Sequence, residues 1–312
     1  MKTWLTQILI CPACLPLEKD LRLKADTQLN DDVLDGSLSC PECLNKYPIR
    51  EGIAMVHPHL QTLKDSGSKY ENSSVVSSYL WSHYCDLLND PEGSSAYQDW
   101  AGLMHSGTGG CLDMGSAVGR FTFDMASRFD FALGIDDSVA FIRAARKLMT
   151  RRRIAVELIQ EGILTRKETL TIPLHWQTQN VEFIVADAMA LPFASGAFSA
   201  LASLNMVDKL PLPLKHLQEA GRLAHREKAQ FLLSDPFSWS KQCAEREHWL
   251  GGKSEGEFAG YGLDNIAGWL ELPRANPGPG WNIEKKGHVW WKSRTHRNHY
   301  ELIRSCYVKA FR

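Results

Sequence analysis

The feature that most constrains this chain is a glycine turn between two apolar runs that each end in an acidic residue. The first run ends at Asp113 and is followed by the turn Gly115-Ser-Ala-Val-Gly119. A helical stretch and a second apolar run then lead to Asp136. Strand, glycine turn, helix, strand and acid in this order are typical of a nucleoside-binding βαβ unit. Glycines let the backbone approach a ligand, and the second acid can accept hydrogen bonds from two ribose hydroxyls.

The charge at this turn favours a cationic ligand over a phosphate. A dinucleotide places its pyrophosphate at the helix N-terminus, where Asp113 would repel it. S-adenosylmethionine carries a sulfonium and an ammonium and no phosphate, so it is the expected cofactor. Many members of families that bind this cofactor have glycine at the position of Ala117, and the methyl group of Ala117 is tolerated there if that residue keeps a negative φ. The predicted cofactor-binding residues are Asp113, Gly115, Ala117, Gly119, Asp136, Asp137, Asp187, Ala188 and Asn205.

Later segments, in the right order, resemble the class I S-adenosylmethionine-dependent methyltransferases. Residues 181–193 are similar to the third motif of that family, in which Asp187 would accept a hydrogen bond from the adenine amino group and Ala188 would line the ring. Apolar runs at 198–204 and 230–235 predict two further strands, and 281–312 predict an antiparallel pair. The resemblance implies a Rossmann-like fold with a seven-stranded mixed sheet over residues 106–312.

Two Cys-x-x-Cys pairs, Cys11/Cys14 and Cys40/Cys43, precede this region. Four thiolates can close a tetrahedron around Zn²⁺ with no open position, which predicts a structural zinc. Disulfides are less favoured because we expect the chain to be cytoplasmic. Residues 5–56 resemble the Trm112-like zinc-ribbon family, whose members accompany methyltransferases as a fused domain or an activating partner. The expected ribbon domain is 1–57.

The regions around these two domains predict simpler structures. Residues 58–105 are expected to be a linker and a helical lead-in that caps the core. A hairpin with a Glu161-Gly162 turn is predicted within 154–180, after a helix that ends near Met149. The six cations of 143–153 favour a solvated helix face, and phosphate contact is the alternative.

The overall composition excludes some classes of function. A net charge of −1 argues against a strongly basic nucleic-acid binder. No apolar stretch approaches the roughly 18 residues of a membrane span. The first ten residues lead directly into Cys11 without a small-residue cleavage site, so we interpret them as structure and not as a signal peptide.

Asn205 and Asp208 directly follow the predicted fourth strand, at the edge where substrate meets cofactor in an open α/β sheet. If the chain enters a helix there, both side chains point to one side. A carboxylate that accepts the N–H of an imidazole makes the other ring nitrogen a better nucleophile. From the spacing alone, capping of the next helix is the better explanation of these two residues. We predict that they are catalytic because of the resemblance that follows.

The segment Asn205-Met-Val-Asp-Lys209 is similar to one found in two families that methylate imidazole. One is the C-terminal methyltransferase domain of ovothiol synthase (5-histidylcysteine sulfoxide synthase), where the similarity extends over roughly 109–312. The other is the DREV type of protein-histidine methyltransferase. The resemblance implies N-methylation of an imidazole in a small histidine derivative or a protein histidine.

Three other functions remain open from the sequence. An RNA base methyltransferase would use the zinc ribbon as an RNA-binding module, and a thiol or small-molecule methyltransferase would share the same fold. A non-catalytic binding module is the third, and the complete set of Asp113, Asp136 and Asp187 argues against it. A substrate with an imidazole is therefore the expected partner, and nucleic acid is the less favoured one.

Overall fold

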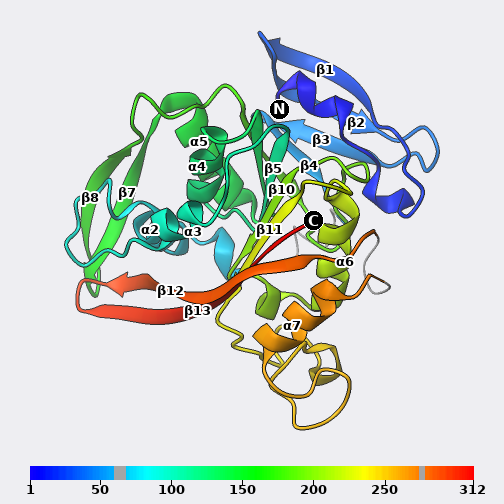
Figure 1. Ribbon diagram of the computed structural model, residues 1–312. Coiled ribbons are helices and arrows are strands. Elements are labelled where there is room, and N and C mark those ends of the chain that lie inside the picture. The colour runs from blue at the N-terminus through cyan, green and yellow to red at the C-terminus, as the bar shows by residue number, and fades with distance from the viewer. Residues whose placement is uncertain (60–67, 274–277) are drawn as a thin grey trace.

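A mixed β-sheet of eleven strands runs through the part of the chain that the computed structural model describes, residues 1–59, 68–273 and 278–312 (Figure 1). The strand order is β1-β2-β3-β4-β9-β6-β5-β10-β11-β13-β12, and β7 pairs with β8 in a separate sheet. In these three stretches no helix is long and apolar enough to cross a membrane.

Seven of the strands form the mixed sheet that the class I resemblance implies. They are β5 (Gly110–Met114), β6 (Phe131–Asp136), β9 (Val181–Ala186), β10 (Ala200–Leu204), β11 (Gln230–Asp235), β12 (Asn282–His296) and β13 (His299–Phe311). The first five are parallel, whereas β13 runs antiparallel to both β11 and β12. The chain order reverses between β5 and β10, and ligands of such sheets bind at the carboxyl ends of the strands beside that reversal.

Helices cover both faces of this sheet. They are α4 (Arg120–Ala126), α5 (Val139–Arg151), α6 (Pro213–Leu223) and α7 (Gly262–Glu271), with the short 3-10 helices η4 (Val207–Lys209) and η5 (Arg246–His248). Alternate residues of each strand join one core with α4 and α5 and a second core with α6 and α7. The predicted helix after Asp136 is confirmed as α5, where the Ser138 hydroxyl accepts the Phe141 N–H at the first turn.

The N-terminal segment contributes the other four strands of the sheet. Its elements are η1 (Thr3–Gln7), η2 (Pro12–Cys14), β1 (Arg22–Leu29), β2 (Asp32–Ser39), β3 (Lys46–Arg50) and β4 (Ile53–Val56). β1 to β4 are antiparallel, and β4 pairs in parallel with β9, with Met55 opposite Val185 and Val56 opposite Ala186. The ribbon therefore extends the seven-stranded sheet and covers the β9 edge, which would otherwise expose unpaired backbone groups.

The lead-in packs over the sheet's carboxyl edge. It contains η3 (Lys69–Glu71), α2 (Ser73–Tyr84) and α3 (Ala96–Gly102), and α2 contacts α5, β7 and β12. Residues 60–67 of the predicted linker lie outside the described residues. The predicted hairpin is confirmed as β7 (Arg153–Glu161) and β8 (Leu164–Thr171), with Gly162 at a φ of 56° in its turn.

Candidate active site

The turn after β5 is built from left-handed backbone. Gly115, Ala117 and Gly119 have φ values of 77°, 45° and 86°. The condition of a negative φ at Ala117 is therefore not met. Its N–H donates to Asp136 Oδ2 at 2.9 Å, and this bond holds a conformation that L residues rarely adopt. A Cβ added to Gly115 would lie 2.5 Å from Met206 Sδ, so glycine is required there.

Two neighbouring strands bring predicted cofactor residues to one edge of the sheet. Asp136 ends β6, and its carboxylate accepts the N–H groups of Ala117 and Ser138 at 2.9 Å each. Burial raises the pKa of Asp136 well above its usual range, and the adjacent carboxyl group of Asp137 adds to the rise. Asp187 follows β9 and accepts the Met189 N–H at 2.8 Å. Since β6 and β9 are parallel neighbours, these carboxyl groups share the carboxyl edge.

Asp113 is more deeply buried than Asp136, Asp137 and Asp187. Its side chain is 2% exposed and accepts a hydrogen bond from the Thr122 hydroxyl at 2.7 Å. Burial raises the pKa of Asp113 to about 7, although the Thr122 hydrogen bond opposes the rise. The carboxyl group thus ties β5 to α4, and a bound cation nearby would favour its charged form.

Asn205 directly follows β10 in a left-handed conformation with a φ of 56°. Its backbone N–H donates to the Ser234 carbonyl at 2.7 Å, and its side-chain Oδ1 accepts the Ser305 hydroxyl at 2.5 Å. The first contact holds the backbone of Asn205, and the second orients its side-chain amide. Its Nδ2 has no hydrogen-bond partner among the residues that the structure describes, so this group is available to a ligand.

Asp208 lies within η4 and is completely buried. Its Oδ2 accepts the Ser238 N–H at 2.6 Å. Lys209 Nζ lies 3.0 Å from Oδ1 as an ion pair, but without the alignment of a hydrogen bond. Burial opposes the charge on Lys209, but the Asp208 carboxylate outweighs this effect and raises the Lys209 pKa. One carboxylate oxygen of Asp208 therefore retains capacity to accept a hydrogen bond.

A second buried carboxyl group, Asp235 at the end of β11, lies beside Asp208. The Asp208 N–H donates to Asp235 Oδ2 at 3.3 Å, and Asp235 Oδ1 accepts the Phe237 N–H at 2.7 Å. Burial raises the pKa of Asp235 well above its usual range, and the charge of Asp208 adds to the rise.

Aromatic side chains of the lead-in cover this edge. The ring of Tyr79, on α2, lies 6.1 Å from that of Tyr70 and 6.3 Å from that of Trp291. Burial raises the pKa of Tyr79, with contributions from Tyr70 and from the carboxyl groups of Asp136 and Asp208. The phenol is therefore close enough to both Asp136 and Asp208 to feel their charges.

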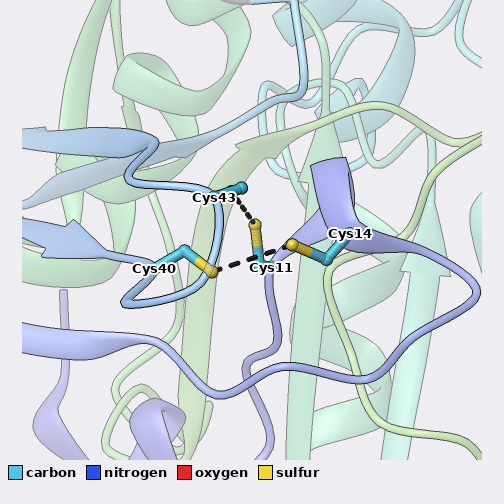
Figure 2. Close-up of side chains that lie close together, drawn as sticks. All are labelled: Cys11, Cys14, Cys40 and Cys43. Carbon is cyan, nitrogen blue, oxygen red and sulfur yellow. Dashed lines mark hydrogen bonds between the residues drawn. The ribbon is translucent and has the colours of Figure 1, made fainter.

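The four predicted zinc ligands converge in the ribbon (Figure 2). The Sγ atoms of Cys11, Cys14, Cys40 and Cys43 all lie within 4.8 Å of one another. Cys11 and Cys43 are 3.5 Å apart and Cys14 and Cys40 are 3.8 Å apart. A tetrahedral Zn²⁺ with Zn–S bonds of about 2.3 Å requires S···S distances of about 3.8 Å, so the cluster fits a structural zinc.

Comparison with protein families decides the class of this chain. Residues 112–229 match the Methyltransf_11 family, described as a methyltransferase domain. The chain is a methyltransferase. Residues 2–52 match the Trm112p-like protein family, so the zinc ribbon is a Trm112p-like module at the N-terminal side of the enzyme. No curated protein matches the sequence.

Solved structures with a similar fold include other methyltransferases. One is from the complex between the Haloferax volcanii Trm112 methyltransferase activator and a candidate methyltransferase, at 10% identity and a TM-score of 0.48, covering 78% of this chain and 97% of that one. Another is an S-adenosylmethionine-dependent methyltransferase from Methanosarcina mazei, at 17% identity and a TM-score of 0.41, covering 64% and 91%. The family matches carry the assignment.

The residues at the turn fit S-adenosylmethionine as the cofactor of this methyltransferase. Carboxyl groups lie near the end of β5, at the end of β6 and directly after β9. Arg120, which follows the turn directly, forms ion pairs with Asp86 and Asp124 at 2.7 and 3.1 Å. Among the described residues, no cation forms an ion pair with Asp113, Asp136 or Asp187. An anionic edge suits a sulfonium better than a pyrophosphate.

The basic run of α5 is only partly a solvated face. Arg146 is 4% exposed and joins the buried carboxylate of Glu182 to the partly exposed one of Asp32. Arg152 donates to the carbonyl groups of Pro173 and Trp176. Arg143 pairs with Glu51 at 3.3 Å and is exposed. The remaining exposed cations of the run are Lys147, Arg151 and Arg153.

Several residues of the site were not found from the sequence. Asp235, Ser305 and Tyr79 come from β11, β13 and α2, and they meet Asn205 and Asp208 only after the chain folds. The acidic end of β11 offered a local signal for Asp235, because a carboxyl group at a strand's carboxyl end faces the ligand edge. Ser305 and Tyr79 had no comparable signal.

Proposed function

We propose that this methyltransferase transfers the methyl group of S-adenosylmethionine to a ring nitrogen of an imidazole, in a small histidine derivative or a protein histidine. The observation that carries the proposal is the state of Asp208. Its carboxylate is buried, one oxygen is held by the Ser238 N–H, and Oδ1 retains acceptor capacity beside Lys209. A ring N–H is the kind of donor that such an oxygen binds.

Asp208 would select one tautomer of the imidazole. By accepting the N–H of one ring nitrogen, it leaves the lone pair on the other nitrogen free to attack. The Asn205 Nδ2, whose plane is set by Ser305, would hold the substrate in line. When bound, S-adenosylmethionine supplies a methyl group activated by its sulfonium.

The carboxylate of Asp208 would then balance the charge of the reaction. Methylation makes the ring cationic, and this carboxylate stabilises that charge as it develops. Transfer of the remaining ring N–H proton to the Asp208 oxygen that accepts its hydrogen bond returns the product to neutrality. Neutral imidazole is abundant at pH 7, because its usual pKa is near 6.5, so orientation contributes more than base catalysis.

RNA base methylation is the second candidate. The Trm112p-like module and the exposed Lys147, Arg151 and Arg153 support it. Against it, Arg146 and Arg152 of the same run are occupied by contacts within the protein. A thiol or another small methyl acceptor would use the same cofactor edge. The assay below distinguishes such an acceptor from an imidazole.

The proposal is tested with labelled S-adenosylmethionine and a panel of histidine, thiohistidine, carnosine-like dipeptides, histidine-rich peptides and RNA. We expect label on an imidazole nitrogen. Asp208→Asn should lower kcat by about 100-fold while leaving the Kd for S-adenosylmethionine unchanged. Asp264→Asn, at an exposed aspartate of α7, is the matched control and should leave kcat unchanged. Label on RNA alone, or an unchanged kcat in Asp208→Asn, contradicts the proposal.

A further inference from the structure

His57 connects the zinc ribbon to the cofactor edge. It directly follows β4, and Val56 of β4 pairs with Ala186 of β9 in a parallel register. The next residue on each strand is therefore His57 on the ribbon side and Asp187 on the methyltransferase side. The side chain of His57 is only 8% exposed, so the structure places it inside this edge and not in the solvent.

The surroundings of the ring define its tautomer. His57 Nδ1 accepts the His59 N–H at 3.0 Å, so in the neutral ring the proton resides on Nε2. Burial lowers the pKa of His57, while the carboxyl groups of Asp187 and Asp137 oppose this effect, which shows that both lie near the ring. Among the described residues, Nε2 has no hydrogen-bond partner.

We propose that His57 is a cofactor-binding residue, whose Nε2–H donates to the adenosine part of S-adenosylmethionine beside Asp137 and Asp187. Purine ring nitrogens and ribose hydroxyls are acceptors, and a neutral imidazole with a free N–H complements them. The carboxyl groups of Asp137 and Asp187 supply acceptors for the hydroxyl and amino groups of the same nucleoside. The Trm112p-like module would thus contribute a side chain to the methyltransferase's own site, in addition to covering the β9 edge.

The role of His57 predicts a specific pattern of affinities. The full-length protein and its variants are titrated by calorimetry with S-adenosylmethionine and with 5′-methylthioadenosine, which lacks the amino-acid part. His57→Ala should weaken both ligands by the same factor, roughly 5- to 30-fold, as expected for one lost hydrogen bond that leaves a polar group unpaired. His57→Gln, which keeps an N–H donor at a similar reach, should bind both within about 3-fold of the unaltered protein.

The control is His175→Ala, at an exposed histidine outside this edge, which should leave both affinities unchanged. Bound zinc and the unfolding midpoint are measured for each variant, and His57→Gln keeps the test valid if His57→Ala loses stability. Unchanged binding in His57→Ala would overturn the proposal. Weaker binding of S-adenosylmethionine without weaker binding of 5′-methylthioadenosine, or a His57→Gln variant as weak as His57→Ala, would also overturn it.

Discussion

Arg146 joins the ribbon to the methyltransferase domain through a buried charge network, and its removal should be costly. Its guanidinium, on α5, bonds both oxygens of Asp32 on β2 at 2.8 and 2.9 Å and also contacts Glu182 on β9. The side chains of Arg146 and Glu182 are 5% and 0% exposed, and that of Asp32 is 18% exposed. Arg146→Met retains the apolar stem but leaves Glu182 without its ion-pair partner and Asp32 with only the N-terminal ammonium of Met1, 2.6 Å away.

Removing one partner of a buried ion pair costs about 3–5 kcal/mol because the remaining charge stays desolvated. Two features reduce this cost here. Glu182 still accepts the backbone N–H groups of Lys2 and Phe183, and Asp32 is partly open to water. We therefore expect Arg146→Met to lower the free energy of unfolding by about 3 kcal/mol.

The assay is urea unfolding followed by far-ultraviolet circular dichroism, with Arg143→Met as the matched control on the same helix. Arg143 is 57% exposed and pairs with an exposed Glu51, so its loss should cost no more than about 0.5 kcal/mol. The double variant Arg146→Met/Glu182→Gln should be more stable than Arg146→Met, because it no longer buries the Glu182 charge. A loss below about 1 kcal/mol for Arg146→Met, or a double variant no more stable than the single one, would refute this reasoning.

Three other predictions follow from the site. Asp136→Ala should weaken S-adenosylmethionine binding at least about 10-fold, because the Asp136 carboxylate also holds the turn through the Ala117 N–H. Calorimetry measures the affinity, and an unchanged value contradicts the prediction. Cys40→Ser should abolish stoichiometric zinc, measured by metal analysis, and lower the unfolding midpoint, whereas a fully zinc-loaded variant would disprove the four-cysteine site. The pKa of Asp113 rises from 3.8 to about 7 on folding, so the folded chain binds a proton that the unfolded chain releases. The free energy of unfolding without cofactor should therefore fall as the pH rises from 4 to 7, by at most about 4 kcal/mol. Asp113→Asn should flatten that slope in urea titrations at several pH values.

Local patterns in the sequence were sufficient for much of the fold. The buried parallel strands are mostly apolar runs, and α5 has an apolar stripe at helical spacing. Both kinds of element can therefore be predicted without knowing which other elements they pack against. The Cys-x-x-Cys pairs were equally informative, because four thiolates at this spacing have few other uses in a short, loop-rich segment. The positive φ of Ala117 could not be predicted locally, because the hydrogen bond that accompanies it comes from Asp136, at the end of another strand.

The glycine turn, the acidic residues at the strand ends and the four cysteines could be predicted from the sequence, because each pattern depends on residues close together in the chain. Only the tertiary structure decided that β4 pairs with β9, which places His57 beside Asp187, and that Asp235 lies against Asp208. These contacts join segments that are far apart in the sequence, and no periodic pattern of residues predicts which of them meet. They form because an open strand edge must be covered and because parallel strands collect their carboxyl ends at one side of the sheet.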